Sequence, residues 1–206
     1  MTGIGSGGLK RGFMSRGLFR ICFLAGCLLL ASFAAAAQDV IHALAATITS
    51  VDSAAKTIGL TTDTGSELTF RELLNSHGKV ILDKNFRADA APADESKIVG
   101  EHAIVFYIGV GNLRTAVALR NIGLGPFTTS AGKVVSFSKR DHLLSITNQS
   151  GEAESFQIAS DTVVDTEMGA LGGVEFKPAK GDPVRVTAGQ SNGNLTALFI
   201  DTLLPN

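Results

Sequence analysis

Hydrophobic and polar positions alternate over short segments of this chain, and the alternation returns at short intervals after residue 46. Residues 57–61 and 144–147 place apolar side chains at every second position, as is typical of a strand with one buried face. Further runs rich in β-branched and aromatic residues predict strands. They cover residues 68–70, 103–108, 115–119, 155–158, 184–188 and 196–200.

Glycine-containing turns separate these strands. Asp63–Ser66 and Gln149–Glu152 each hold a glycine, which supplies the positive φ that a tight hairpin needs. Ser191–Asn194 is the clearest hairpin signal, and Gly109–Asn112 is its counterpart earlier in the chain. Short strands with such turns favour a sandwich or a barrel.

One pattern occurs twice. Ala46–Phe70 aligns without a gap to Gly132–Phe156 at an offset of 86, and Gly111–Ala116 matches Gly193–Ala197 with Arg114 as an insertion. The identical pairs are Ser50/Ser136, Thr61/Thr147, Gly65/Gly151 and Phe70/Phe156. We interpret this as a tandem duplication of roughly 80 residues per copy, a usual size for a small domain.

The fold prediction is all-β, with two tandem small OB-like β-barrels of about five strands each. The predicted parts are a signal peptide (1–37), a first barrel (38–122) and a second barrel (123–206). The first copy has additional residues at Arg71–Lys79, with a helical turn around Leu73-Leu74 as one interpretation, and Ala88–Glu95 predicts an exposed loop. Asn121–Ser130 is the predicted link, short enough to keep the barrels close.

Residues 1–37 have the features of an export signal. Four basic residues precede an apolar run of about 14 residues, Ile21–Ala34, which is shorter than the roughly 20 residues of a membrane helix. Ala35-Ala36-Ala37 fits a cleavage motif, so we expect cleavage between Ala37 and Gln38. The expectation is a periplasmic or secreted protein with no membrane span after cleavage.

Two alternatives concern this leader. Met14 is an alternative start, because the segment after it is a more ordinary signal peptide. Leu24–Cys27 resembles a lipobox, which would place a lipid anchor on Cys27. The apolar run that continues past Cys27 favours cleavage after Ala37 instead.

Removal of the leader changes the chemistry of the chain. Cys22 and Cys27 are the two cysteines, so the mature chain has no disulfide or thiolate site. Its 14 basic and 19 acidic residues give a net charge of −5. A nucleic-acid binder usually has a basic face, and this balance predicts no nucleic-acid partner.

The repeat resembles an uncharacterised bacterial envelope domain of the DUF5666 type. The second copy carries its outline in residues 132–137, 181–186 and 197–200, and the first in residues 46–52, 100–101 and 116–119, with Ala46 and Glu101 in place of the usual Gly and Asp. The resemblance implies an exported small β-barrel without an established activity. The outline is also similar to periplasmic copper/silver-binding efflux barrels. However, the chain has no Trp, and Met168 is the only methionine of the mature part, so their soft-metal function is not expected here.

Few residues of the chain suggest a metal-binding or catalytic role. His42, His77, His102 and His142 lack the spacing of a local metal site and are interpreted as scattered surface or loop residues. Asp161, Asp165 and Glu167 form an acidic cluster whose oxygen atoms suit Ca²⁺, but they lack the EF-hand pattern, which favours a solvated loop.

Two further motifs favour structural interpretations. Gly109-Val110-Gly111 lies between two strands and predicts a hairpin rather than a phosphate-binding loop. Alternation puts Phe106 and Tyr107 on opposite faces of one strand, which predicts one core and one rim residue. We therefore assign no catalytic, cofactor-binding or metal residue and expect no cofactor.

The sequence favours an exported, non-catalytic binding or interaction module of the cell envelope, with an envelope protein or small ligand as its partner. A metal or small-ligand carrier is one alternative, and a hydrolytic enzyme with an unrecognised site is another. Shared residues lie at strands and turns, whereas the polar candidates are not shared. A functional site is therefore expected where the copies differ, in 71–79, 88–95 or 165–179.

Overall fold

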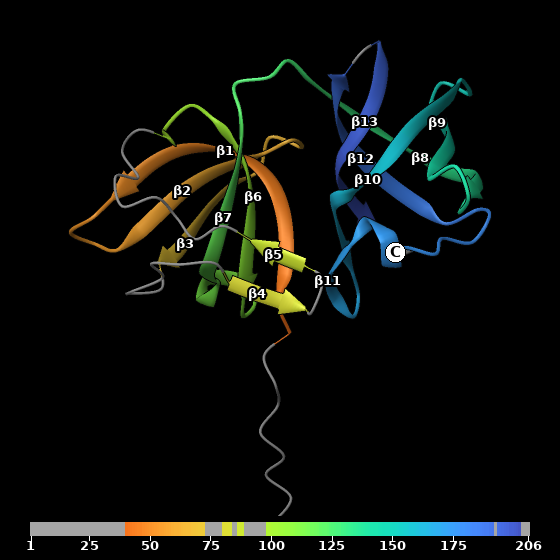
Figure 1. The fold of residues 1–206 in the computed structure, drawn as a ribbon. Helices are drawn as coiled ribbons and strands as arrows, with labels where there is room; N and C mark the ends of the chain where they lie inside the picture. The colour runs from red at the N-terminus through yellow and green to blue at the C-terminus, as the bar shows by residue number, and fades with distance from the viewer. Residues whose placement is uncertain (1–39, 73–79, 84–85, 89–97, 192, 203–206) are drawn as a thin grey trace, which may run out of the picture. The chain divides into compact units, whose positions relative to one another are not determined.

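A computed structural model of the protein describes residues 40–72, 80–83, 86–88, 98–191 and 193–202 (Figure 1). These residues form strands and short 3₁₀ turns, which confirms the all-β prediction. The elements are β1 (His42–Asp52), β2 (Thr57–Thr62), β3 (Glu67–Glu72), β4 (Val80–Asp83), β5 (Phe86–Ala88), β6 (His102–Ile108), η3 (Gly111–Leu113), β7 (Thr115–Gly123), β8 (Phe127–Ser138), β9 (Leu143–Asn148), β10 (Ala153–Thr166), β11 (Gly169–Gly172), η4 (Gly173–Glu175), β12 (Pro183–Ser191) and β13 (Asn194–Thr202).

The first barrel is a closed ring of five strands in the order β1-β2-β3-β7-β6. Its neighbouring strands are antiparallel except β3 and β7, which run parallel where Arg71 lies beside Thr115. The antiparallel pairing of β6 with β7 confirms that Gly109–Gly111 belongs to a hairpin. Strands β4 and β5 form a separate two-stranded sheet.

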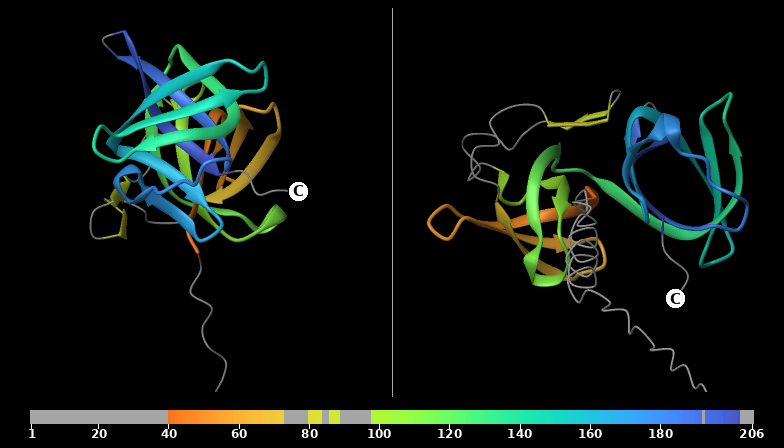
Figure 2. Two further views of the ribbon diagram at one scale, coloured as in Figure 1. Left: turned by 90° about the vertical axis from the view of Figure 1, so that its right-hand side faces the viewer. Right: turned by 90° about the horizontal axis from the view of Figure 1, so that it is seen from below.

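The second barrel is built from a six-stranded sheet in the order β11-β10-β13-β12-β8-β9. Strand β9 also pairs with β10, so five of these strands are joined in a ring and β11 adds to β10 outside it. Figure 2 (right) shows this ring nearly end-on. The ring has the same order as the first barrel, including one parallel pair, β10 with β13. The prediction of two small OB-like barrels is therefore confirmed.

The two barrels repeat the same backbone contacts at the positions that align in the sequence. Ile48 pairs with Leu60 and Val134 with Ile146, and a bulge follows each pair. Gly100 N–H donates to Ile48 O at 2.7 Å, and Gly181 N–H donates to Val134 O at 2.8 Å. Both glycines have a positive φ, 92° and 95°, which a residue with a side chain rarely adopts. The shared residues therefore fix backbone geometry, while the duplication itself stays a prediction.

Each barrel has its own hydrophobic interior. The inward faces of the first barrel pack around the fully buried Phe70, and those of the second pack around Phe156. These two phenylalanines are an identical pair of the sequence repeat. Burying one such ring stabilises a fold by roughly 2–3 kcal/mol.

A third hydrophobic cluster joins the outer faces of the two barrels within the compact unit 39–206. Ile104 and Phe106 of β6 lie in it with Val163 of β10 and Phe199 of β13. Their β6 neighbours Ala103 and Val105 face the interior of the first barrel instead. Strand β6 is thus buried on both faces, which explains why residues 103–108 are continuously apolar rather than alternating.

The link between the barrels is shorter than predicted. Strand β7 continues to Gly123, which pairs with His102, and β8 starts at Phe127, which pairs with Gly189. Only residues 124–126 connect the strands, so the prediction of a ten-residue link at Asn121–Ser130 is wrong. Backbone pairing at both ends takes up the remaining residues.

Several predictions fall on residues outside the described ranges. They are the cleavage site at Ala37/Gln38, the lipid alternative at Cys27, the start at Met14, the helical turn at Leu73-Leu74, and His77. The predicted loop at residues 88–95 is described only at Ala88, which ends β5.

Candidate functional site

Asp165 of the second barrel binds the first strand of the first barrel. Its Oδ1 accepts a hydrogen bond from Ala43 N–H at 2.9 Å, and His42 Nδ1 lies 3.2 Å from the same oxygen. The carboxyl is only 16% exposed. Burial raises the pKa of Asp165 to about 6, although the Ala43 N–H and His42 act in the opposite direction.

A second carboxyl lies beside Asp165. Asp201 of β13 is its register partner on the parallel strand, and its Oδ2 lies 3.3 Å from Arg185 Nη1. Burial raises the pKa of Asp201, and Arg185 opposes this shift. Burial, together with the charges of Asp165 and Asp201, also raises the pKa of Tyr107, while Arg114 lowers it. Several ionisable groups therefore meet between the barrels.

A third carboxyl, Asp63, extends from the β2–β3 hairpin of the first barrel to the second. Its Oδ2 accepts hydrogen bonds from the hydroxyls of Thr187 at 2.7 Å and Thr129 at 3.0 Å. Its Oδ1 lies 3.6 Å from His102 Nε2, and the His102 ring packs against Phe127 of β8. Asp63 therefore connects both barrels through one side chain.

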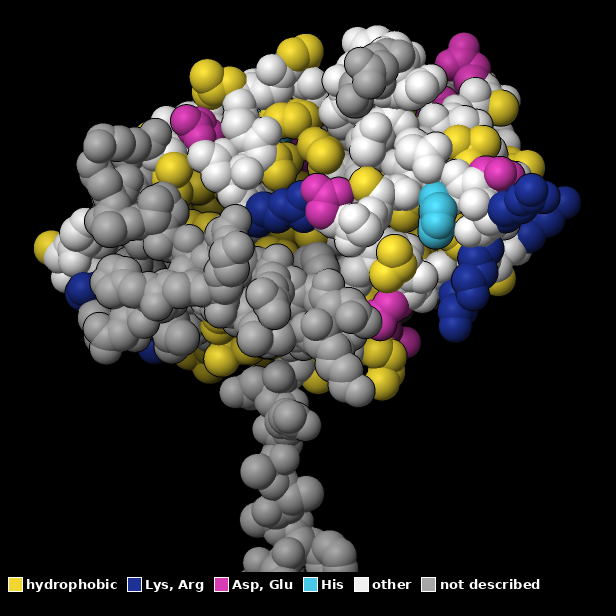
Figure 3. Space-filling model, in the orientation of Figure 1, with side chains coloured by type: hydrophobic (Ala, Val, Ile, Leu, Met, Phe, Trp, Pro, Cys, Tyr) yellow, Lys and Arg dark blue, Asp and Glu magenta, His cyan; other side chains and the backbone are white. Residues whose placement is uncertain are grey.

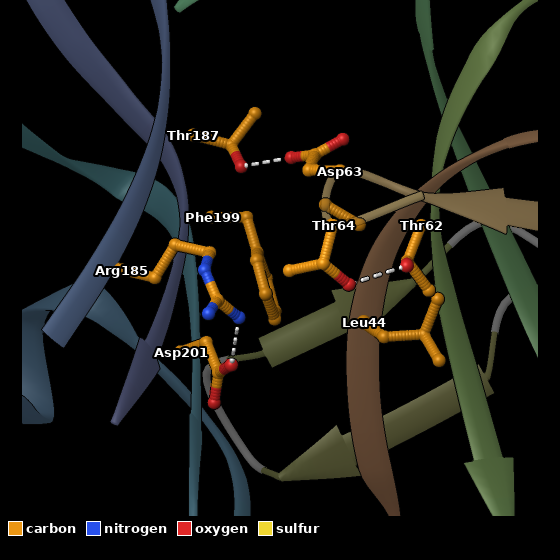
Figure 4. Close-up of a pocket in the computed structure, with 9 residues that line it drawn as sticks. Leu44, Thr62, Asp63, Thr64, Arg185, Thr187, Phe199 and Asp201 are labelled. Carbon is orange, nitrogen blue, oxygen red and sulfur yellow. Dashed lines mark hydrogen bonds and ion pairs between the residues drawn. The ribbon is translucent and has the colours of Figure 1, made fainter. Parts of the chain in front are cut away.

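A cavity of about 100 Å³ lies among these groups (Figure 4). Leu44 and Asp63 line it from the first barrel, and Arg185, Phe199 and Asp201 line it from the second. Ligand pockets are usually about 300–1,000 Å³. Because the carboxyls that line it are already paired, we interpret this cavity as part of the contact between the barrels.

A larger hollow of about 410 Å³ lies on the second barrel alone, between the β10–β11 turn, η4 and the start of β12. We call it the β11 groove. Its apolar lining includes Leu171, Phe176 and Pro178, and Phe176 is buried in the core of the second barrel. Its charged lining residues, Glu167, Glu175, Lys177 and Asp182, are all exposed.

The groove has an apolar centre and a mainly acidic edge, with Met168 86% exposed beside it. In Figure 3, acidic and hydrophobic side chains lie next to one another at the lower edge of the second barrel, where Figure 1 places the β10–β11 hairpin. Isolated exposed apolar residues are common, so the combination of the apolar lining with the mainly acidic edge, rather than Met168 alone, makes the groove a candidate binding surface.

Local hydrogen bonds fix the backbone of the groove. Thr166 Oγ1 donates to Gly169 O at 2.9 Å and accepts from Met168 N–H at 3.2 Å. At the other side, Asp182 Oδ2 accepts from Ala179 N–H at 2.7 Å. The groove is therefore formed by turns that are held in place without a ligand, as is usual for binding sites.

Gly173 sets the position of η4 against β10. A Cβ atom at this residue would lie 2.7 Å from Ile158 Cγ2 and 2.8 Å from Ala159 O. Thr162 fills the adjacent position, where its hydroxyl donates to Ala197 O at 2.7 Å and accepts from Ala159 N–H. Only glycine allows the chain to approach this closely, and this approach places Glu175 and Phe176 at the groove.

The interpretation of the histidines as scattered surface or loop residues is wrong for two of them. His42 and His102 lie on strands, are less than one-third exposed, and each faces a carboxylate where the barrels meet. The sequence could not show this because their partners Asp165 and Asp63 are 123 and 39 residues away. His142 is exposed in a turn with a positive φ of 51°.

The three acidic residues that were predicted to form a cluster, Asp161, Asp165 and Glu167, contact different parts of the structure. Asp161 pairs with Arg120 of β7, with 2.5 Å between Oδ2 and Nη2, whereas Asp165 contacts His42 and Ala43. Glu167 is exposed and lines the β11 groove. Among the described residues, no group of three or more His, Cys, Asp or Glu side chains could hold a metal ion.

Phe106 and Tyr107 lie on opposite faces of β6 as predicted, but neither is a rim residue, because Phe106 lies in the cluster between the barrels and Tyr107 packs on the interior of the first barrel. Phe106 is fully buried, while Tyr107 is half-buried and packs its ring against Phe70 at 5.1 Å. The Arg114 guanidinium lies over the rings of Tyr107 and Phe70, at 5.5 and 5.8 Å from their centres. Tyr107 is therefore covered by side chains of its own barrel.

Sequence reasoning missed Asp63, Arg185 and Asp201, because each belongs to an ordinary turn or strand. The groove was only partly foreseen. Residues 165–179 stood out as a segment that differs between the copies, and they supply most of the lining of the β11 groove. Nothing in the sequence singled out Asp182 and Pro183 as lining residues of the groove, because they belong to the motif 181–186, which was interpreted as part of the barrel scaffold.

No family model matches this chain, and no curated protein matches it. In the ranges that the structure describes, the chain forms no apolar helix of membrane-spanning length.

Proposed function

We propose that this protein is an exported, non-catalytic binding module of the bacterial cell envelope, which binds its partner in the β11 groove. The observation that carries the proposal is the groove itself. Its volume of about 410 Å³ lies within the usual range of ligand sites, and hydrogen-bonded turns hold it open. The leader-like segment 1–37 and the resemblance to DUF5666-type domains support an envelope location, periplasmic or secreted.

The rest of the molecule supports a scaffold role. The polar groups between the barrels face one another and surround a cavity of only about 100 Å³. This arrangement fixes the second barrel, and with it the groove, against the first. The barrels therefore serve as a rigid support, and recognition is assigned to the turns of the second barrel.

The test compares three forms of the chain beginning at Gln38 as baits for envelope extracts. They are the unaltered protein, Met168→Ala with Glu175→Ala in the groove, and Glu152→Ala in the β9–β10 turn as the control. We expect a partner that the unaltered protein and the control retain and the groove variant loses. Retention by all three would contradict the assignment of the groove. Turnover of ester, glycoside or phosphate substrates that a point variant abolishes would contradict the non-catalytic function.

A further inference from the structure

We infer that the β11 groove binds a basic segment of a partner protein that carries apolar side chains between its positive charges. This inference rests on the proposed function and names the chemistry of the partner. It follows from the charge of the groove edge, the apolar centre and the edge of β11.

The charge of the groove favours a cation. Glu167, Glu175 and Asp182 line it, and among the described lining residues Lys177 is the one that is basic. All four are exposed, so their charges act in solvent and are screened at distances beyond about 8 Å at physiological salt. Their effect is therefore local to the groove, and it has the same sign as the net charge of −5 of the mature chain, which includes them. An acidic or phosphorylated segment would be repelled here.

The centre of the groove favours apolar side chains. Leu171 packs on the core of the second barrel, and the Phe176 ring lies 6.0 Å from the Phe137 ring within that core. Met168 stands at the edge, almost fully exposed. A methionine side chain is flexible and polarizable, so it adapts to apolar partners of different shape. A purely polar cation would leave this surface in contact with water.

The backbone of β11 favours recognition by side chains rather than by strand addition. Ala170 N–H on the outer edge of β11 already donates to Ile41 O at 2.8 Å. A Cβ at Gly169 would lie 2.7 Å from Val40 Cγ1 and 2.8 Å from Ile41 O. The segment before β1 therefore occupies this part of the edge, and a partner strand cannot pair there. The groove accordingly recognises the charges and apolar groups of the partner.

The test titrates the isotope-labelled chain beginning at Gln38 with three short peptides of alternating residues and follows amide shifts by NMR. The peptides are lysine–leucine, glutamine–leucine and glutamate–leucine. We expect lysine–leucine to bind with shifts at residues 167–176, and glutamine–leucine to bind about fivefold more weakly, because the neutral peptide cannot form the exposed ion pairs with the mainly acidic edge. Equal binding of the lysine and glutamine peptides, or shifts confined to another surface, would overturn the inference.

Variants that reverse single acidic charges test whether the lysine–leucine peptide binds in the groove. Glu175→Lys and Glu167→Lys should each weaken lysine–leucine binding about threefold or more. Met168→Ala should weaken the binding of the lysine–leucine and glutamine–leucine peptides alike, because both carry leucine side chains. Glu152→Lys is the matched control, since Glu152 is equally acidic and exposed but lies in the β9–β10 turn. An equal loss with Glu152→Lys would assign the effect to net charge and overturn the inference.

Two other occupants of the groove, a second copy of the chain and a membrane surface, are tested with the same protein. Dimerisation that Met168→Ala abolishes, measured by sedimentation, would assign the groove to a second copy. Displacement of the peptide by vesicles of phosphatidylcholine and phosphatidylglycerol would assign it to a membrane surface. Either result overturns the inference. If the lysine peptide fails but the extract partner still depends on Met168 and Glu175, the proposed function stands and only the basic partner is rejected.

Discussion

Asp165 and Asp201 lie in register on two parallel strands of the second barrel, and each has a partner of a different kind. Asp165 contacts His42 and Ala43 of the first barrel, while Asp201 contacts Arg185 of its own barrel. Burial raises the pKa of both carboxyls. Two carboxylates that share a partly buried surface are costly to ionise together, so the contact between the barrels should depend on pH.

Asp165→Asn tests this dependence. The folded pKa of Asp165, about 6, is above the ordinary value of 3.8, so the folded state holds the proton more tightly than the unfolded state. Stability therefore falls as pH rises from about 4 to about 6, and the charged form costs up to about 3 kcal/mol above that range. The asparagine keeps an acceptor for Ala43 N–H without the charge. Chemical denaturation at a series of pH values should show Asp165→Asn more stable than the unaltered protein at pH 8 and this advantage lost near pH 4.5.

The matched variant Asp165→Ala separates charge from hydrogen bonding. It removes the charge and also leaves Ala43 N–H without its acceptor, which costs about 1–3 kcal/mol. We expect it to be less stable than Asp165→Asn at every pH. Equal stability of the two variants would show that the hydrogen bond is unimportant, and a flat difference between Asp165→Asn and the unaltered protein would contradict the raised pKa.

Thr187→Val tests the connection through Asp63. The Thr187 side chain is buried, and its hydroxyl donates to Asp63 Oδ2. The valine keeps the shape and removes the donor, which should lower the free energy of unfolding by about 1–2 kcal/mol. Thr128→Val is the control, because Thr128 is exposed and its hydroxyl contact with Ala188 O is long, 3.5 Å. The control should change stability by less than about 0.5 kcal/mol. A Thr187 variant that resembles the control would show that Asp63 does not stabilise the contact.

The local parts of the fold were predictable from the sequence, whereas the polar residues that meet between the barrels were not. Turns such as Asp63–Ser66 depend on residues a few positions apart, and alternation reports which face of a strand is buried. Neither indicates what covers an outer face. Asp63 and Thr187 are 124 residues apart, and nothing local distinguishes them from other turn and strand residues.

One signal for the contact was present in the sequence. Residues 103–108 are continuously apolar, where a strand of a solvent-facing barrel should alternate. Such a run indicates burial on both faces, and β6 is the strand that carries Phe106 into the cluster between the barrels.

The candidate site, the β11 groove, was also only partly predictable from the sequence. The segment 165–179 could be selected because it differs between copies, but the groove depends on how η4 packs at Gly173, which only the three-dimensional contacts show.

Gly132→Ala tests a difference between the two copies. Gly132 aligns with Ala46, which is fully buried in the first barrel, but a Cβ at Gly132 would lie only 2.3 Å from Thr147 O. Because backbone must shift, we expect a loss of about 3 kcal/mol, measured by thermal or chemical unfolding. Gly189→Ala is the control, since its Cβ would meet only flexible side-chain atoms, those of Leu198 from 3.3 Å and Phe127 Cδ1 at 3.9 Å, and it should cost less than about 1 kcal/mol. A Gly132 variant as stable as the control would contradict the described approach of β8 to β9.

Phe106→Ala tests whether the two barrels unfold together. Phe106 is fully buried in the cluster between them with Val163 and Phe199, whereas Phe156 lies inside the second barrel. Removal of a buried phenylalanine ring costs about 3–5 kcal/mol, and both Phe106→Ala and Phe156→Ala should lose this amount. Phe106→Ala and Phe156→Ala should differ in whether the two barrels still unfold together. Calorimetry should show one transition for the unaltered protein and two for Phe106→Ala, because the second barrel keeps its interior when the contact is weakened. A loss below about 1 kcal/mol with one remaining transition would show that the cluster between the barrels does not couple them.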